Sequence, residues 1–189
     1  ATSTTKAYRS GLKVVPLTAD AVFPCDYLLD AEGRGVVAAA IKVLEESAVF
    51  RNDFLDNTAA IKNYCVLRFA GLVREEFVAI WADSLGRIIS VETLATGSLH
   101  QAVFHVREVV RAGLANNAAA VIFAHNHPGS DTEETCKDAV ATFLLKSALM
   151  LVDIVVVDHL IVAGGEALSF VEAGLMESRF ASREQRDLQ

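Results

Sequence analysis

The chain has few cysteines, prolines and tryptophans, with three, three and one among 189 residues. Cys25, Cys65 and Cys136 are widely spaced, and none belongs to a CxxC pair typical of a structural zinc site. Three cysteines are also too few for a disulfide scaffold, so we expect reduced thiols. The sequence has neither an apolar run of about 18 residues nor a leader-like start. We therefore expect no membrane span, no signal peptide and a cytoplasmic protein.

Positive charge is also scarce. Lys and Arg number 17 against 24 Asp and Glu, giving a formal net charge of −7. Non-specific nucleic-acid binding needs clustered basic side chains that neutralise phosphates. The basic residues in the middle of the chain are spaced as on solvated helix faces: Lys62, Arg68, Arg74, Arg107 and Arg111. A nucleic-acid partner is therefore not favoured, although a local basic patch is left open.

Apolar residues are abundant and make up 52% of the chain, with Ala and Val prominent. Such a composition suits a buried sheet covered by helices. The length corresponds to about one ordinary domain with short accessory elements at its ends. Both ends are polar and lack periodicity, so we expect mobile tails there.

Hydrophobic periodicity predicts two leading helices and then a change to strand-like runs. The second helix has Asp56 or Asn57 as its N-cap and closes on Gly71. The predicted helices cover 35–50, 56–72, 105–117 and 132–149, and the predicted strands cover 76–84, 87–95, 118–125, 151–157, 159–163 and 167–170. The order ααββαβαβββ indicates an α/β (α+β) fold in which one mixed sheet carries helices on its faces.

The segment AHNHPGSD, residues 124–131, ends a predicted strand with two of the five histidines of the chain. Because side chains alternate along a strand, His125 and His127 project to one side and Asn126 to the other. Pro128 cannot extend a β-ladder, so both imidazoles lie at the carboxyl edge of the sheet, where α/β proteins tend to bind ligands. Two polar groups at a strand end are the alternative interpretation.

A strong helix start follows the histidines. Its N-cap candidates and first-turn acids are Ser130, Asp131, Thr132, Glu133 and Glu134. Thr135 and Asp138 are three residues apart and share a helix face, from which the carboxylate can reach back to the histidines. Two imidazoles and one carboxylate form a three-ligand zinc set that leaves the fourth position for water, as in catalytic zinc sites.

These residues resemble the motif of the JAMM (MPN+) metalloproteases and, within them, the RadC-like proteins. That motif has an upstream Glu, then His-x-His-Pro, six residues, Ser, two residues and Asp. The chain matches it with His125-Asn126-His127-Pro128, the six residues 129–134, Thr135 in place of Ser, and Asp138. The segments 86–128 and 151–176 also resemble RadC sequence, and the whole resemblance covers about 50–176.

The resemblance implies a JAMM/MPN (cytidine-deaminase-like) fold, with a mixed β-sheet flanked by helices and an N-terminal helical extension. We expect a flexible tail over 1–33, the helical extension over 34–72, the JAMM/MPN catalytic domain over 73–178 and a polar tail over 179–189. The helix-hairpin-helix segment of long RadC proteins has no counterpart, so we expect the short form.

The resemblance also implies roles for individual residues. His125, His127 and Asp138 would hold one Zn²⁺ ion per chain, which would make hydroxide available from water at neutral pH. Glu92 would be the general base that later delivers the proton to the leaving amine, provided that it faces the histidines. The hydroxyl of Thr135 would support the oxyanion.

Two departures from the family motif bear on activity. Thr135 keeps the hydroxyl of the family's Ser but adds a methyl group and a stiffer side chain. Gly129 and Ser130 stand in the reverse of the family's Ser-Gly order, which moves the residue that tolerates positive φ. Metal binding is therefore a firmer expectation than turnover.

The remaining histidines and the cysteine beside Thr135 are weaker candidates. Asp158 and His159 could form a pair that supports a metal ligand, although a hydrogen-bonded strand histidine is the favoured interpretation. We expect His105 to open a helix and His100 to lie in a loop. Cys136 has no obvious base beside it, which disfavours a cysteine nucleophile.

Three functions remain open. The first is a zinc hydrolase, a metallopeptidase or isopeptidase that cleaves an accessible amide bond of a peptide or protein. The second is a DNA-repair-associated RadC-like factor that binds DNA or acts as a nuclease, and the third is a zinc-binding scaffold without turnover. The sequence identifies no particular substrate, and a homodimer is left open.

Overall fold

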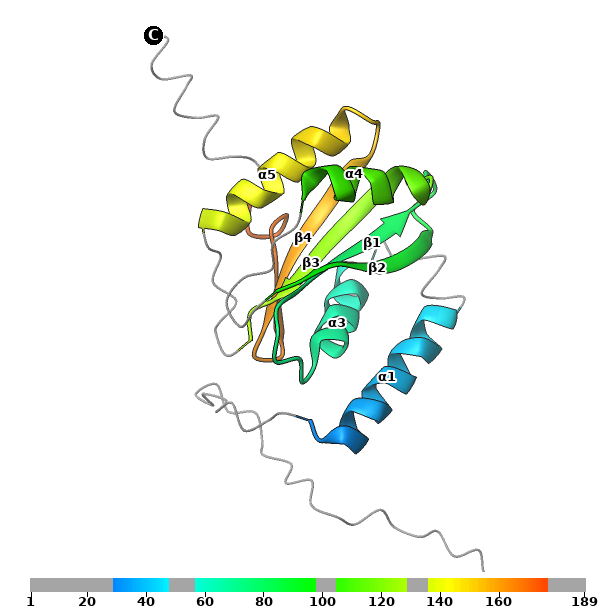
Figure 1. Cartoon of the computed structure of the whole chain (residues 1–189), viewed down its shortest axis with the longest axis vertical. Helices are drawn as coiled ribbons and strands as arrows, with labels where there is room; N and C mark the ends of the chain where they lie inside the picture. The colour runs from blue at the N-terminus through cyan, green and yellow to red at the C-terminus, as the bar shows by residue number, and fades with distance from the viewer. Residues whose placement is uncertain (1–28, 48–56, 98–104, 129–135, 177–189) are drawn as a thin grey trace, which may run out of the picture.

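The computed structural model describes residues 29–47, 57–97, 105–128 and 136–176. Its elements are α1 (Ala31–Glu46), α3 (Thr58–Phe69), β1 (Glu76–Ala82), β2 (Ile88–Thr96), α4 (Val106–Ala115), β3 (Ala120–Asn126), α5 (Cys136–Met150), β4 (Val155–Ala163) and β5 (Glu166–Ser169). They form one five-stranded sheet in the order β2-β1-β3-β4-β5 (Figure 1). Strands β3 and β4 are parallel and the other neighbours are antiparallel, which confirms the predicted mixed α/β fold.

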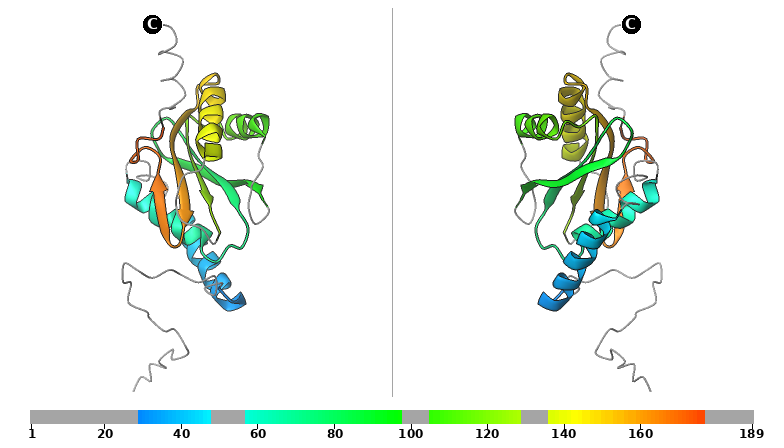
Figure 2. Two further views of the ribbon diagram at one scale, coloured as in Figure 1. Left: turned by 90° about the vertical axis from the view of Figure 1, so that its left-hand side faces the viewer. Right: turned by 90° about the vertical axis from the view of Figure 1, so that its right-hand side faces the viewer.

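Helices cover both faces of the sheet (Figure 2). On one face, α4 and α5 bury a core made of Phe77, Ala79, Trp81, Val109, Val121, Phe123, Leu145, Leu149, Ile154 and Val156. On the other face, α3 packs on a second core made of Ile61, Tyr64, Cys65, Phe69, Val78, Ile80, Ile88, Ile122, Ala124, Leu160 and Val162. The alternation of strand side chains separates the two cores.

The turns and caps follow local chemistry. Asn57 caps α3 by accepting a hydrogen bond from the backbone N–H of Ala60 at 3.0 Å, as one of the two predicted caps. The other candidate, Asp56, lies outside the described residues. Gly164 and Gly165, with φ of 56° and 85°, turn the chain between β4 and β5, as the sequence indicates.

Strand β4 corrects one sequence-based expectation. The runs 151–157 and 159–163 were predicted as two strands, whereas residues Val155–Ala163 form one continuous strand. The polar Asp158 does not interrupt it because this buried carboxylate is well satisfied. It accepts hydrogen bonds from the Ser169 hydroxyl at 2.6 Å and from the backbone N–H groups of His159 and Val171 at 2.7 and 3.0 Å.

Helix α1 lies at the periphery and has no buried residue. The Tyr64 hydroxyl of α3 donates a hydrogen bond to Glu45 of α1, and Ile41 packs against the α3-side core. Helix α3 is part of that core. The predicted division of the chain into a helical extension over 34–72 and a catalytic domain therefore stays a prediction.

The predicted tails at 1–33 and 179–189 lie largely or wholly outside the described residues. None of the described helices is long and apolar enough to cross a membrane.

Candidate metal centre

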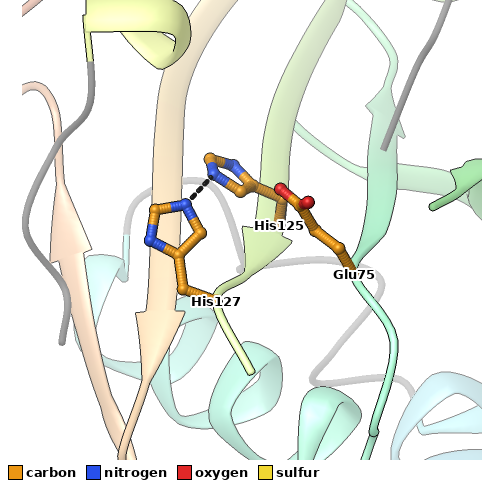
Figure 3. A group of neighbouring side chains, drawn as sticks. All are labelled: Glu75, His125 and His127. Atoms are coloured by element: carbon orange, nitrogen blue, oxygen red, sulfur yellow. Dashed lines mark hydrogen bonds between the residues drawn. The ribbon is translucent and has the colours of Figure 1, made fainter. Parts of the chain in front are cut away.

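The carboxyl end of β3 presents the two histidines of the His-x-His segment. Phe77, the second residue of β1, pairs with His125, so this end of β3 adjoins the start of β1. The backbone N–H of His127 donates to the carbonyl of Val162 at 2.9 Å, which holds His127 against β4. The Nε2 atoms of His125 and His127 are 2.9 Å apart, so both imidazoles point at the same place (Figure 3).

Asp138, in the first turn of α5, reaches both histidines. Its Oδ1 lies 3.2 Å from Nε2 of His125, and its Oδ2 lies 3.7 Å from Nε2 of His127. The structure thus brings together the three residues expected as ligands. Their role as metal ligands stays a prediction.

An additional acidic residue, Glu75, lies at this place and was not among the residues predicted from the sequence. It immediately precedes β1, and one of its carboxylate oxygens lies with ring nitrogens of His125 and His127 in a group whose atoms are all within 4.8 Å of one another (Figure 3). A signal for it exists in the sequence. The pair Glu75-Glu76 opens the first strand of the hairpin, and an antiparallel neighbour of β3 must begin where β3 ends.

Asn126, between the two histidines, fixes the backbone on both sides of Glu75. Its side chain is 4% exposed and lies on the sheet face opposite the histidines. The amide donates to the carbonyl of Arg74 at 3.0 Å and accepts from the backbone N–H of Glu76 at 2.8 Å. One side chain of the motif therefore pins both residues that flank Glu75.

Glu92 does not lie in this group. Glu92 is on β2 and pairs with Ala79 of β1, and Ala79 pairs with Phe123 of β3. Strand β1 therefore lies between Glu92 and β3, and Glu92 is level with Phe123, two residues before His125. Its carboxylate accepts a hydrogen bond from the side-chain amide of Asn116, at the end of α4, at 2.9 Å. The structure thus separates Glu92 from the histidines, and its catalytic role stays a prediction without geometric support.

The other residues predicted from the sequence lie away from this group of histidines and acidic residues, or lie outside the described residues. Thr135, Gly129, Ser130 and His100, which was expected in a loop, lie outside the described residues. His105 is exposed and caps the start of α4 without a side-chain hydrogen bond to the helix, so it does open a helix, as predicted.

His159 of β4 lies behind the two histidines and is 1% exposed. Its Nε2 is 2.9 Å from Nδ1 of His125, and its Nδ1 is 2.5 Å from the hydroxyl oxygen of Thr142 on α5. Burial, followed by the electrostatic effect of the neighbouring His125, lowers the pKa of His159 well below its usual value. His159 is thus a hydrogen-bonded strand histidine that contacts a predicted ligand, while its neighbour Asp158 is bonded to Ser169 and backbone amides.

The donor atoms at this place suit zinc. Two imidazole nitrogens and carboxylate oxygens are a common ligand set for Zn²⁺, which binds them at about 2.0–2.2 Å. Tetrahedral coordination at such distances would put two ligand nitrogens roughly 3.3 Å apart. The observed separation of 2.9 Å between the Nε2 atoms is close to this value. The residues present therefore fit the expected cation.

The fold and this site define the class of protein. A mixed sheet flanked by helices, with two histidines at the end of a central strand and acidic side chains beside them, has the architecture of a JAB/MPN domain. The family model described as "RadC-like JAB domain" matches residues 55–175. The chain belongs to the RadC-like JAB domain family.

Several curated proteins resemble this chain over most of its length. The UPF0758 protein YeeS of Escherichia coli is 39% identical over 143 residues, which cover 76% of this chain and 97% of YeeS. The UPF0758 protein YfjY of Escherichia coli is 39% identical over 155 residues, covering 82% and 97%. A UPF0758 protein of Nitrosospira multiformis is 43% identical over 146 residues, but these span 65% of that longer protein and 77% of this chain.

Proposed function

We propose that this protein is a zinc-dependent hydrolase that cleaves an amide or isopeptide bond of a peptide or protein. The observation that carries the proposal is the convergence of His125, His127, Asp138 and Glu75 at one edge of the sheet. His125, His127 and Asp138 would hold the ion. Zinc, when bound, would supply a Lewis acid that lowers the pKa of water toward about 7.

In this proposal, Glu75 is the general base in place of Glu92. A general base must come within hydrogen-bonding reach of the proton that it removes. The Glu75 carboxylate is grouped with both histidines, whereas Glu92 lies on β2 and accepts a hydrogen bond from Asn116 at the end of α4. Glu75 would accept the proton of the attacking water at a carboxylate oxygen and deliver it to the leaving nitrogen.

A matched pair of variants tests the assignment. Glu75→Gln keeps the size of the side chain but removes its basicity, so we expect hydrolysis to fall by about 100-fold or more while zinc content stays near one ion per chain. Glu92→Gln, the control, should retain hydrolysis. The measurements are zinc by inductively coupled plasma and turnover on a mixture of quenched peptides and lysine-linked isopeptides.

Three results would count against this proposal. If Glu75→Gln loses zinc, Glu75 is a ligand and not the base. If Glu92→Gln alone abolishes turnover, the base is Glu92. If the unmodified protein binds zinc but cleaves none of these substrates, the zinc-binding scaffold is the better description.

A further inference from the structure

We infer that His159 and Thr142 form a buried hydrogen-bonded relay that fixes the tautomer of His125 and ties this histidine to the helix of Asp138. Both are positioning residues. The inference rests on the proposed function only in that His125 and Asp138 are taken as ligands of the same ion. The relay itself is drawn from three hydrogen bonds that join β3, β4 and α5.

The direction of the relay follows from counting protons. The Thr142 hydroxyl has a single proton and donates it to the carbonyl of Asp138, one turn earlier in α5, at 2.7 Å. Toward His159 the same oxygen must therefore accept, so Nδ1 of His159 carries a proton across their 2.5 Å contact. A neutral imidazole has one ring proton, which leaves Nε2 of His159 as an acceptor.

The relay continues into the first predicted ligand. Because Nε2 of His159 accepts, Nδ1 of His125 donates to it across 2.9 Å. The one ring proton of a neutral His125 is thereby on Nδ1, and its Nε2 lone pair faces His127 and Asp138. That is the tautomer that a cation at this place requires.

Among the described residues, the relay is shielded from water. His159 and Thr142 are 1% and 2% exposed, so water does not replace either contact. Aromatic rings surround His159, with the centroids of Phe77, Phe123 and Phe170 at 5.6, 6.3 and 5.0 Å. Such rings favour a neutral imidazole, and they hold its plane in place.

The relay also connects two ligands that come from different elements. It begins on His125 at the end of β3 and ends on the carbonyl of Asp138, whose carboxylate lies 3.2 Å from His125 Nε2. It thereby fixes α5 in position against the sheet at the level of the metal site. Outer partners of this kind commonly change metal affinity by about 10- to 100-fold when removed.

Two variants of Thr142 test the relay. Thr142→Val keeps the shape but removes the oxygen, and we expect its Kd for Zn²⁺, measured by chelator competition, to rise about 10-fold or more. Thr142→Ser restores the oxygen and should bind zinc nearly as the unmodified protein does. Equal zinc affinity in the Val variant and the unmodified protein would overturn the inference.

A second readout depends neither on zinc binding nor on turnover. Two-dimensional ¹H–¹⁵N spectra of the histidine rings in the metal-free protein should show protons on Nδ1 of both His125 and His159. His159→Phe, which adds one more ring to an aromatic cluster, should release His125 from the Nδ1–H form. A doubly protonated His159, or a proton on Nε2 of His125, would refute the relay.

The two proposals fail in different ways. Loss of the Nδ1–H tautomer refutes the relay whatever the protein hydrolyses. A protein that binds zinc, loses affinity on Thr142→Val and cleaves no amide refutes the hydrolase while the relay stands. His105→Gln, which changes an exposed histidine outside the group, should leave both the zinc affinity and the other ring signals unchanged.

Discussion

At the scale of single residues, the site depends on polar side chains that project from one strand to opposite faces of the sheet. His125 and His127 face α4 and α5, while Asn126 faces the other side and holds the backbone around Glu75. Among small side chains, an amide offers a donor and an acceptor together, and both are used here. The middle residue of His-x-His thus connects the predicted metal ligands to the proposed base.

Replacing Asn126 with Ala should impair the proposed base, Glu75, while leaving the predicted metal ligands in place. The Arg74 carbonyl and the Glu76 N–H would lose their partner, which costs about 1–3 kcal/mol of unfolding free energy for a buried group. Glu75 would be less well placed, and a displacement of about 1 Å can lower turnover about 100-fold. We expect kcat to fall while bound zinc stays near one ion per chain, as measured by steady-state kinetics and metal analysis.

Asn63→Ala, at an exposed position of α3, is the matched control and should change neither quantity. Unchanged kcat in Asn126→Ala would show that Glu75 does not depend on this clamp. A parallel loss of zinc would place the effect of Asn126 on the histidines instead.

At the scale of elements, the site shows what the sequence could predict and what it could not. His125, His127 and Asp138 lie close together in the sequence, at the end of β3 and in the first turn of α5, so their spacing is local and could be read directly. The choice between Glu75 and Glu92 depends on which hairpin strand pairs with β3. Strand order is a tertiary property, and it places the start of β1 beside His125 and Glu92 one strand further away.

The same limit explains the error in β4. A polar residue within an apolar run suggested a break, but Asp158 finds its partners on the segment after β4. Local composition does not reveal partners that come from another element. The predicted helices and the hairpin were recovered because their periodicity, caps and turn residues are local.

Helix α4 packs closely against the sheet at Gly113. A Cβ added there would come within 2.8 Å of Ile154 Cδ1 and within 3.1 Å of the Trp81 ring, which is fully buried. Overpacking of this kind costs about 1–3 kcal/mol, against a gain of about 1 kcal/mol in helix propensity. Gly113→Ala should therefore lower the free energy of unfolding, as measured by urea denaturation.

Gly35→Ala in α1 is the matched comparison, because a Cβ there meets nothing within 4 Å. Only the propensity gain applies, so this variant should equal or exceed the unmodified protein in stability. If both variants were stabilised equally, the contact between α4 and Trp81 would be looser than described.

At the scale of the whole molecule, charge argues against the nucleic-acid alternative. The net charge is −7, and most basic residues considered for a patch form ion pairs with glutamates. These pairs are Lys62–Glu172, Arg68–Glu76, Arg107–Glu108 and Arg111–Glu108. Charges that are paired locally are less available for phosphates, so the described residues favour the interpretation of solvated helix faces.

The stability of the metal-free protein should depend on pH through His159. Its pKa is about 6.5 in the unfolded chain and well below the usual value in the fold, mainly because burial disfavours the charged ring. As the pH falls below about 6.5, His159 becomes protonated in the unfolded chain but stays neutral in the folded chain. The stabilisation is therefore complete above this pH and is lost on acidification, by about 1.4 kcal/mol at one pH unit below.

Urea denaturation of the metal-free protein at pH 8 and near pH 5.5 measures this loss. The unmodified protein and His105→Gln, which changes an exposed histidine, should lose stability alike. His159→Phe cannot take up the proton in either state, so its loss should be smaller by about 1.4 kcal/mol. Identical losses in all three proteins would mean that His159 is protonated in the fold, because only a group whose pKa differs between the two states links folding to pH.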